Sequence, residues 1–571
     1  MKKFFVLLLW WFTMAGGYGQ RFCNPLDTPM VLSATFGELR PNHFHSGIDI
    51  KTDEVTGKPV RAIEDGYIYR IKMSPYGFGK ALYVMHYNGK TSVYGHLCCF
   101  APAIDSVVIA EMYRKHKNSI EFFPKKIKIK VKKGEIIGYS GNSGSSQGPH
   151  LHFEVRDTKT EHPLNPLRFG FNVKDTVKPQ MYDLLVYDLG NKFYQNGAYC
   201  GAYRIKKEGH INAKVVKYVL DVDTVKVPEK AGFVLHVADF VNRSSSVCGV
   251  YGIVLKMDGQ KMFEVRFDEF SFYETRYINS FMDYPQYKLE KKKRYRLFKQ
   301  PGNRLSFLDK SGSGMVEIHD GNVHSIEITV YDVYENFSVL TFAVKRDTSL
   351  KCTVDTAGKI LLSRKKSINV LKGKYFEFDI LGKSLYDDAY IGFTVDSDSR
   401  FLSPVIRFGS NRTIPLHKRN MLKIKPYDAI PDYLQPKVTI VKVNGRKMYD
   451  AGGHYAKNGY VVTKVRDFAD YAVTVDTINP VITPLNIYAS KNMKSESNIV
   501  FKVTDNLTGI GGYQCYIDGK WTRVDYDIKE HKMYCMFREV LKQKSGIAHR
   551  IIFTVVDEKG NSNVYQTKFM Y

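Results

Sequence analysis

Long apolar runs, redox motifs and helical periodicity are all scarce in this 571-residue sequence. After the first residues, no stretch approaches the roughly 20 apolar residues that a helix needs to cross a bilayer, so we expect no transmembrane anchor. No Cys-x-x-Cys pair is present, which argues against a dithiol redox catalyst. Apolar residues rarely recur at helical spacing, which argues against a mainly helical protein.

Residues 1–19 have the layout of a secretory signal peptide. In MKKFFVLLLWWFTMAGGYGQ a lysine pair precedes an apolar run and then small residues, and we expect cleavage near Gly19. Cys23 follows Gln-Arg-Phe rather than the small residues that precede a lipidated cysteine, so we expect no lipid anchor. The protein is therefore expected to be exported and to be periplasmic, bound to the cell envelope or extracellular.

Eight cysteines in an exported chain are candidates for disulfide bonds. We expect Cys200 to pair with Cys248 and Cys515 to pair with Cys535, although connectivity does not follow from sequence alone.

The formal net charge of +26 indicates attraction to polyanionic surfaces. Nucleic acid suits this charge, but a secretory signal and the absence of a recognisable nucleic-acid module argue against it. Polyanions of a cell wall or an outer surface fit better. The alternative is that the lysines are scattered over solvated strand faces without a common partner.

Short runs rich in Val, Ile, Tyr and Phe alternate with polar residues between Gly, Asn and Asp turns, as in DGYIYRIKM and IKIKVKKGEIIGYSG. This period of two residues predicts an all-β protein. After the signal peptide we expect a first folding unit that folds by itself, a stretch of linker strands with an immunoglobulin-like β-sandwich, a further β-rich domain and a C-terminal immunoglobulin-like β-sandwich. Their respective ranges are 20–175, 176–347, 348–477 and 478–571.

Two of these units resemble each other in sequence. LHVADFVNRSSSVCGVYG, from Leu235, and FKVTDNLTGIGG, from Phe501, both run from a strand ending in Asp through a polar loop to glycine, and a DG hairpin turn follows each. Their ends also correspond, since IEITVYDVYENFSVLTFAV matches RIIFTVVDEKGNSNVYQTKF. A repeat of about 80 to 110 residues with short strands is typical of immunoglobulin-like sandwiches.

One segment of the first unit departs from the strand pattern. DSVVIAEMYRKHKNSIEFF, from Asp105 to Phe123, contains good helix formers behind a possible N-cap at Asp105 or Ser106. We interpret residues 101–130 as an insertion that holds a helix or lid, and the alternative is an ordinary surface excursion.

The stretch GPHLHFEV places His150 and His152 one residue apart in an apolar strand. Side chains at i and i+2 of a strand project from the same face, so both imidazoles and Glu154 are expected to form one row. Such a row suggests a metal site or a proton carrier, although a buried histidine is more often a structural residue.

Two other stretches supply further ligand candidates. NHFHSGIDI places His45 four residues before Asp49, and SVYGHL ends an alternating strand at His96. Two histidines and one carboxylate leave a coordination position open, as in catalytic zinc sites, where zinc activates water for attack on an amide. Spacing alone does not say which of the four histidines are ligands.

The residues His45-Ser-Gly-Ile-Asp49, Tyr94-Gly-His96 and His150-Leu-His152 together resemble the motif set of the lysostaphin/LytM-type zinc metallopeptidases, which cut peptide cross-links in bacterial peptidoglycan. The resemblance covers the first domain only. It implies a compact antiparallel β barrel or sandwich at residues 20–175, followed here by immunoglobulin-like β-sandwich domains. The long interval between His96 and Val131 departs from the family pattern.

The resemblance also implies a role for each motif residue. His45, Asp49 and His152 are expected to bind one Zn²⁺ per chain, and His96 and His150 to act catalytically beside the metal. His43 lies outside the motif and is interpreted as a surface or groove-wall residue. Glu154 is interpreted as structural or as a support for the metal ligands rather than as catalytic.

These expectations describe an exported zinc metalloendopeptidase acting on peptidoglycan. The β-sandwich domains are expected to position it at the wall or against other cell-envelope proteins. Two alternatives remain: a non-catalytic protein that binds the wall or activates an amidase, and a protease whose substrate is an exported protein.

Overall fold

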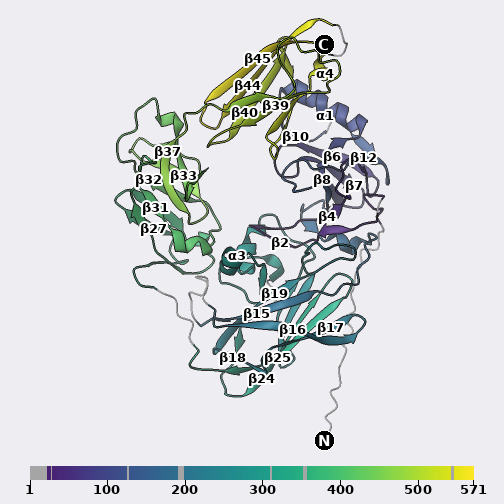
Figure 1. Cartoon of the computed structure of the whole chain (residues 1–571). Coiled ribbons are helices and arrows are strands. Elements are labelled where there is room, and N and C mark those ends of the chain that lie inside the picture. Colours follow the sequence, from purple (N-terminus) through teal and green to yellow (C-terminus); the bar gives the residue numbers. More distant parts are fainter. Residues whose placement is uncertain are drawn as a thin grey trace.

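The computed structural model describes residues 22–27, 29–124, 128–190, 199–308, 312–350, 356–541 and 546–571. The predicted signal peptide lies outside these residues. The chain is predominantly β, as predicted, and its four domains form a closed ring in which the C-terminal domain returns to the N-terminal domain (Figure 1). None of the helices in the described ranges is long and apolar enough to cross a membrane.

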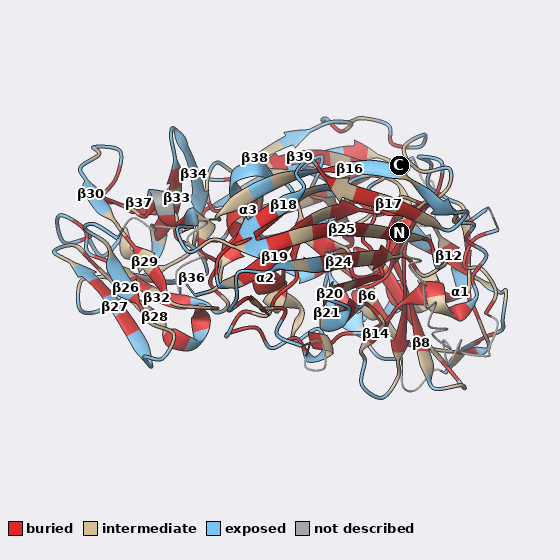
Figure 2. Ribbon diagram, turned by 90° about the horizontal axis from the view of Figure 1, so that it is seen from below, coloured by how far each residue is buried: buried red, intermediate tan, exposed pale blue. Residues whose placement is uncertain are grey.

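A nine-stranded antiparallel sheet forms most of the N-terminal domain. Its buried positions alternate with less buried ones in the outer strands, whereas β8 is buried almost throughout (Figure 2). The path of the sheet is β1 (Leu32–Ala34), β4 (Ile48–Lys51), β13 (His150–Asp157), β8 (Lys90–Leu97), β7 (Lys80–His86), β6 (Gly66–Met73) and β10 (Ile120–Phe122), with β11 (Ile129–Val131) paired to β6 and β14 (Pro163–Leu164) to β13.

Two smaller sheets complete this domain. One is three-stranded, in the order β5 (Pro59–Arg61), β12 (Ile136–Tyr139) and β9 (Cys99–Phe100), and the other is the hairpin of β2 (Leu39–Arg40) and β3 (His43–Phe44). The hairpin lies directly before the motif that begins at His45.

The insertion contains a helix, but our predicted start for it was wrong. Helix α1 covers Pro102–Lys115 and begins three residues before Asp105, because Pro102 occupies its first turn, where a missing N–H has no cost. Ile104, Val108 and Met112 bury one face of α1 in the core of the domain. The residues after α1 then form β10 and β11, which both pair with β6.

The second domain contains an eleven-stranded sheet. Its path is β21 (Gln260–Arg266), β20 (Gly252–Met257), β24 (Val323–Tyr331), β25 (Phe337–Arg346), β17 (Val215–Leu220), β16 (Gly201–Asn212), β15 (Gln180–Asp188), β19 (Lys230–Ala238) and β22 (Arg294–Arg296), with β18 (Thr224–Val227) paired to β25 and β23 (Val316–Glu317) to β19. Two short helices, α2 (Ile278–Phe281) and α3 (Tyr284–Glu290), follow β21.

Two five-stranded sheets form the third domain and share one core, in which β28 and β32 of one sheet face β33 and β37 of the other. The first sheet runs β27 (Ile368–Gly373), β28 (Phe376–Leu381), β32 (Asn420–Ile424), β36 (Val461–Val465) and β35 (His454–Tyr455), and the second runs β30 (Thr394–Asp396), β31 (Val405–Arg407), β37 (Asp470–Val475), β33 (Val438–Asn444) and β34 (Lys447–Asp450). A separate pair joins β26 (Ile360–Leu362) to β29 (Ala389–Ile391).

Two four-stranded sheets form the C-terminal domain and pack through Phe501 and Phe553, whose rings stack with centroids 4.6 Å apart. The first runs β38 (Val481–Pro484), β39 (Ile499–Thr504), β43 (Lys532–Cys535) and β42 (Val524–Asp527), and the second runs β41 (Lys520–Thr522), β40 (Ile510–Ile517), β44 (Ala548–Asp557) and β45 (Ser562–Met570); helix α4 covers Phe537–Val540.

Apolar contacts join the N-terminal domain to both of its neighbours in the ring. Phe36, Leu39 and Phe44, on and beside the β2–β3 hairpin, belong to the core of the second domain. Trp521 of the C-terminal domain is buried against α1, edge-on to Tyr113 with ring centroids 5.1 Å apart.

Our predicted disulfide pairs were both wrong. Cys200 is disulfide-bonded, but Cys248 is a free buried thiol and therefore is not its partner. Cys515 and Cys535 are both free and buried, and they lie close enough for a hydrogen bond between their thiols. The two cysteines, on β40 and β43, are therefore close together, as we predicted, but no disulfide bond joins them.

Candidate metal centre

The three predicted metal ligands converge at one point of the large sheet. Asp49 on β4 and His152 on β13 are directly paired across antiparallel strands, and His45 precedes β4. His45 Nε2 lies 3.1 Å from Asp49 Oδ1 and 3.1 Å from His152 Nδ1, and His152 Nδ1 lies 2.8 Å from Asp49 Oδ1. All three side chains are buried.

Gly47 allows the loop that carries His45 to lie against β13. A Cβ atom added to this glycine would lie 2.2 Å from the carbonyl oxygen of Phe153, closer than any side chain can approach. A glycine is therefore required between the predicted ligands His45 and Asp49, because the backbone of β13 leaves no space for a side chain.

Hydrogen bonds to Thr35 and Glu154 determine which ring nitrogen of His45 and of His152 faces the candidate metal centre. Nδ1–H of His45 donates to the carbonyl oxygen of Thr35 at 2.8 Å, and Nε2–H of His152 donates to Glu154 Oε1 at 3.0 Å. Thr35 and Glu154 each occupy the outer nitrogen of one ring, so His45 Nε2 and His152 Nδ1 are the nitrogens that face the centre and would offer their lone pairs to a metal ion.

Glu154 is fully buried and held ionised. Arg156 Nε donates to Glu154 Oε2 at 2.6 Å, and the hydroxyl of Ser46 donates to Oε1. Burial alone would raise the pKa of Glu154, but Arg156, His152 and Ser46 lower it to about 2. This geometry fits a supporting role beside the histidine ligand.

Arg40 orients the third ligand and was not anticipated from the sequence. Its guanidinium donates to Asp49 Oδ2 at 2.7 Å, which leaves Oδ1 facing the two histidine nitrogens. Burial would raise the pKa of Asp49, but the neighbouring His45, His150 and His152 hold it well below its usual value. The carboxylate is therefore ionised.

The two predicted catalytic histidines flank the same centre. His150 Nε2 lies 3.6 Å from Asp49 Oδ1, and its Nδ1–H donates to the carbonyl oxygen of Gly148 at 2.8 Å. His96 Nδ1–H donates to the carbonyl oxygen of Ser143 at 2.9 Å, and its ring centroid lies 4.8 Å from that of His150. In the neutral form of each ring, this hydrogen bond places the proton on Nδ1 and leaves Nε2 as the acceptor.

His96 adopts an unusual backbone conformation at its position on β8. Its φ of 60° lies in the left-handed region, and its N–H donates to the carbonyl oxygen of Phe78 at 2.8 Å. The Phe78 ring also stacks on His152, with centroids 4.6 Å apart. Phe78 was missed because it lies in a loop outside every motif. His43 is exposed and remains outside the cluster, as expected.

The donor set fits zinc. Two imidazole nitrogens and one ionised carboxylate oxygen lie within 4.8 Å of one another, and each is aimed at the centre by a hydrogen bond on its other atom. Zinc sites that retain an open position commonly use three protein ligands of these types. The five motif residues lie together at this centre, whereas Thr35 and Arg40, which carry no motif, were not anticipated from the sequence.

The sequence profile of Peptidase family M23 matches residues 112–166, which contain His150 and His152. DD-carboxypeptidase/endopeptidase Mpg of Neisseria meningitidis serogroup B is 34% identical over 124 residues, and glycyl-glycine endopeptidase ALE-1 of Staphylococcus capitis is 31% identical over 110 residues. The N-terminal domain belongs to the lysostaphin/LytM-type M23 peptidases.

The likeness is confined to this M23 domain. The match covers 22% of this chain and 22% of the Neisseria protein, and 19% of this chain and 24% of the Staphylococcus protein, so the chain spans about a quarter or less of the length of these relatives. The catalytic domain of the M23 protein EnpA from Enterococcus faecalis is 26% identical, with 27% of this chain and 99% of that chain covered and a TM-score of 0.20. A Zu5-like profile matches residues 362–476 of the third domain.

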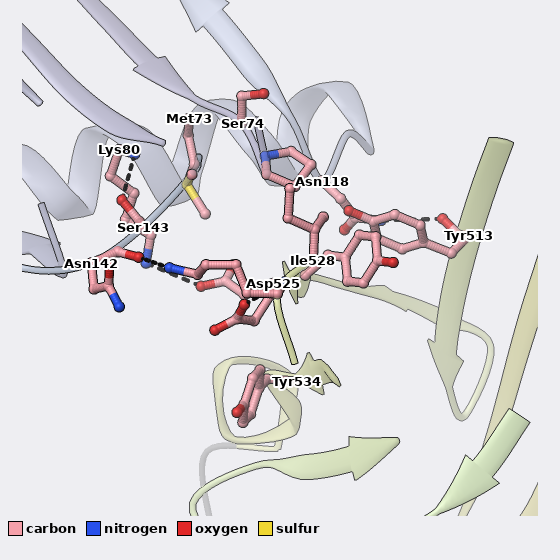
Figure 3. A pocket seen from close by; sticks show the side chains of 15 residues that line it. Met73, Ser74, Lys80, Asn118, Asn142, Ser143, Tyr513, Asp525, Ile528 and Tyr534 are labelled. Carbon is pink, nitrogen blue, oxygen red and sulfur yellow. Dashed lines mark hydrogen bonds and ion pairs between the residues drawn. The ribbon is translucent and has the colours of Figure 1, made fainter. Parts of the chain in front are cut away.

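A pocket of about 180 Å³ separates the M23 domain from the C-terminal domain (Figure 3). On the M23 side it is lined by Asn142 and Ser143, the loop whose carbonyl accepts the His96 hydrogen bond. From the other side, Lys529 donates to the carbonyl oxygen of Asn142, and Asp525 forms an ion pair with Lys80 at 3.1 Å. The C-terminal domain thus contacts the loop that orients His96.

Proposed function

We propose that the protein is an exported zinc metalloendopeptidase that hydrolyses peptide cross-links of bacterial peptidoglycan. The observation that carries the proposal is the convergence of His45 Nε2, Asp49 Oδ1 and His152 Nδ1, with each ligand oriented by a second residue. Relatives of the M23 domain are named as endopeptidases, which supports this reaction class.

His45, Asp49 and His152 would hold the metal ion. Bound there, zinc supplies a Lewis acid that lowers the pKa of water from about 15.7 to about 7 and polarises a carbonyl group. Thr35, Glu154 and Arg40 keep the ligand atoms aimed at one point, so the site needs little rearrangement when it is filled.

His150 and His96 are suited to moving the proton. Burial, followed by the charges of His152 and His150, lowers the pKa of His96 to about 3, so its ring is neutral at pH 7. In each ring Nδ1 donates to a backbone carbonyl and Nε2 is the acceptor. The lowered pKa of His96 disfavours its protonated form, so His150 is the ring that accepts a proton from the attacking water. The protonated ring can then donate that proton to the amine that leaves, or a hydrogen bond to the developing oxyanion.

Access to this centre is from the side of His150, the most exposed of the five side chains. Its side chain is 16% exposed, against 2% for His45, 3% for His152 and 8% for Asp49. A substrate therefore meets His150 before the ligands, which suits an extended peptide lying across the surface of the large sheet.

Muropeptide release from purified peptidoglycan tests the proposal. Mature protein with one zinc per chain should reduce the amount of cross-linked dimers, and mass spectrometry of the products identifies the bond that is cut. A zinc chelator should abolish release, and added zinc should restore it. Walls with direct cross-links and walls with glycyl bridges should be compared, because one relative is named a DD-carboxypeptidase/endopeptidase and the other a glycyl-glycine endopeptidase.

Two substitutions separate the roles within the site. His45→Ala should lower zinc content, whereas His150→Ala should retain zinc and lose about 10²-fold or more of the turnover. His43→Ala is the matched control, because His43 is an exposed histidine on the hairpin directly before His45, and it should keep both zinc and activity. Full activity of His150→Ala would contradict the proton-transfer role.

The alternatives predict different outcomes in the same assay. A zinc-loaded protein that binds walls but releases nothing would favour a non-catalytic wall-binding or amidase-activating protein. Cleavage of exported proteins without cleavage of walls would favour a protease with a protein substrate.

A further inference from the structure

Three aspartates meet where the M23 domain joins the second domain. Asp175 lies in the segment that leads into β15, Asp239 directly follows β19, and Asp332 directly follows β24. One carboxylate oxygen from each lies within 4.8 Å of the other two. Asp239 is 3% exposed and Asp332 is 5% exposed, so like charges are gathered away from solvent.

The protein supplies few partners for this cluster. Asp332 accepts hydrogen bonds from the backbone N–H groups of Tyr334 and Asn336, and Asp175 accepts one from Val177. Oδ1 of Asp239 is buried and has no hydrogen-bond partner. Among the described residues, no lysine or arginine forms an ion pair with any of the three carboxylates.

Leaving this cluster without a counter-charge is costly. Burial, together with the charge of Asp332, raises the pKa of Asp175 to about 7, and burial with the charges of Asp332 and Asp175 raises that of Asp239 well above its usual value. A buried, unpaired carboxylate normally acquires a proton or a cation.

A small cavity lies beside the three carboxylates. Its volume is about 10 Å³, which is room for about one water molecule or a single ion. The three aspartates line it together with Tyr334, whose buried hydroxyl also lacks a hydrogen-bond partner. Two buried oxygen atoms without hydrogen-bond partners, Asp239 Oδ1 and the Tyr334 hydroxyl, therefore belong to residues that line a space large enough for one ion.

The arrangement recurs in the C-terminal domain, at the positions that the sequence repeat brings into correspondence. Asn336 donates to Asp332 Oδ2 at 2.6 Å, and Asn561 donates to Asp557 Oδ2 at 2.6 Å. Each triad also begins with Asp-Thr-x-x-Pro. The second triad consists of Asp476, Asp505 and Asp557.

The two triads differ in one way that matters for charge. At the position of Tyr334 the C-terminal repeat has Lys559. Burial lowers the pKa of this lysine overall, although the charges of Asp450, Asp476 and Asp557 act to raise it. In the first triad Lys214 acts on Asp332, but it forms its ion pair with Glu335.

We propose that Asp175, Asp239 and Asp332 form a binding site for a hard divalent cation, with Ca²⁺ as the expected ion. The ligands are all oxygens, which Ca²⁺ and Mg²⁺ prefer. Mg²⁺ usually retains several waters, for which the cavity has no room, whereas Ca²⁺ accepts carboxylates in irregular geometry.

The position of the site indicates what the ion stabilises. Thr35 of the M23 domain lines the same cavity, and its hydroxyl exchanges hydrogen bonds with Gly249 of the second domain, at 3.0 Å each way. The carbonyl of Thr35 orients His45. A cation bound by the triad would therefore stabilise the Thr35–Gly249 contact between the two domains, and through Thr35 the orientation of His45.

Calcium binding to the full mature chain tests the proposal. The chain is freed of metal ions, given one equivalent of zinc, and titrated with Ca²⁺ alone in a calorimeter. We expect binding at or below about 1 mM Ca²⁺ and a rise of about 5 °C in the unfolding temperature, with a smaller rise for Mg²⁺. The proposal is overturned if neither ion binds or shifts unfolding.

Asp239→Asn is the decisive variant, because it keeps the shape of the side chain and removes the unpaired charge. It should bind one Ca²⁺ fewer per chain and unfold at or above the wild-type temperature without Ca²⁺. Added Ca²⁺ should not raise its unfolding temperature through this site. Asp223→Asn, an exposed change in the same domain, should behave as wild type. Unchanged calcium stoichiometry in Asp239→Asn would contradict the assignment.

Terbium offers a readout that does not depend on a variant folding. Tb³⁺ commonly replaces Ca²⁺ and emits when a nearby tyrosine is excited, and Tyr334 lines the cavity. We expect sensitised emission that Ca²⁺ displaces. Emission that Ca²⁺ cannot displace would argue against the site.

Discussion

Phe44, the residue before the proposed ligand His45, packs its ring against Phe270 of the second domain, with centroids 5.5 Å apart. Phe267 contacts the same ring at 5.8 Å. The hairpin directly before His45 is therefore anchored in the core of a different domain.

This contact predicts that Phe44→Ala weakens both the domain joint and zinc binding. Loss of a buried phenylalanine ring typically costs about 3 to 5 kcal/mol, and here the cost falls on the hairpin beside His45. We expect a lower free energy of unfolding in denaturant and weaker zinc binding in competition with a chelator. Tyr273→Ala, at a side chain that is 96% exposed, is the control and should change neither quantity.

Glu154→Gln tests the orientation of His152. The amide oxygen can still accept the hydrogen bond from Nε2–H, but the negative charge that strengthens it is lost. Loss of such a supporting partner typically lowers metal affinity about 10- to 100-fold, and we expect that range by competition titration. Glu54→Gln, at an exposed glutamate just after β4, should leave zinc affinity unchanged. Equal affinity in both variants would remove Glu154 from the metal site.

Trp521→Ala tests whether the ring is closed in solution. Trp521 contacts Tyr113 and stacks on His116 with centroids 5.5 Å apart, so its removal takes an apolar anchor from the junction at α1. Small-angle X-ray scattering should report a larger radius of gyration for this variant than for wild type. Tyr488→Ala, at an exposed tyrosine of the same domain, serves as the control. An unchanged radius would show that the polar contacts alone keep the ring closed.

The pH dependence of stability tests the aspartate triad independently. The pKa of Asp175 is raised to about 7 by burial and by Asp332, so the folded state binds a proton more tightly than the unfolded state. Its contribution to stability is therefore present below about pH 4 and lost as the pH rises through about 7. In Ca²⁺-free buffer, the urea midpoint should fall across this interval.

Added Ca²⁺ should remove most of that fall, because the cation replaces the proton as the partner of the carboxylates. Asp175→Asn should show a flatter profile in the same interval without Ca²⁺. A midpoint that rises between pH 4 and 7 in the wild type, with no change in Asp175→Asn, would contradict the raised pKa.

The strand pattern and the histidine motifs could be interpreted from sequence because they depend on local spacing. Alternation of apolar residues predicted strands such as β6, and the five residues of the site were identified before their convergence was known. The start of α1 was misplaced because Ser and Asp outrank Pro as N-cap signals, although Pro102 opens the helix.

The remainder could not be predicted because it depends on contacts between distant segments. Arg40 reaches Asp49 only after the β2–β3 hairpin turns back toward β4, and Thr35 reaches His45 through a loop. The wrong disulfide pairs have the same origin, since the proximity of two cysteines does not determine whether their thiols are oxidised. Residues 20–175 were expected to fold alone, a prediction that stays untested.

The position of Phe36, Leu39 and Phe44 in the core of the second domain bears on how this peptidase domain can be reused. A fragment cut at residue 175 would expose these three hydrophobic side chains on and beside the hairpin that precedes His45. Fusing that fragment to a foreign targeting module would leave them uncovered, so the smallest transplantable unit of this protein includes the second domain as well.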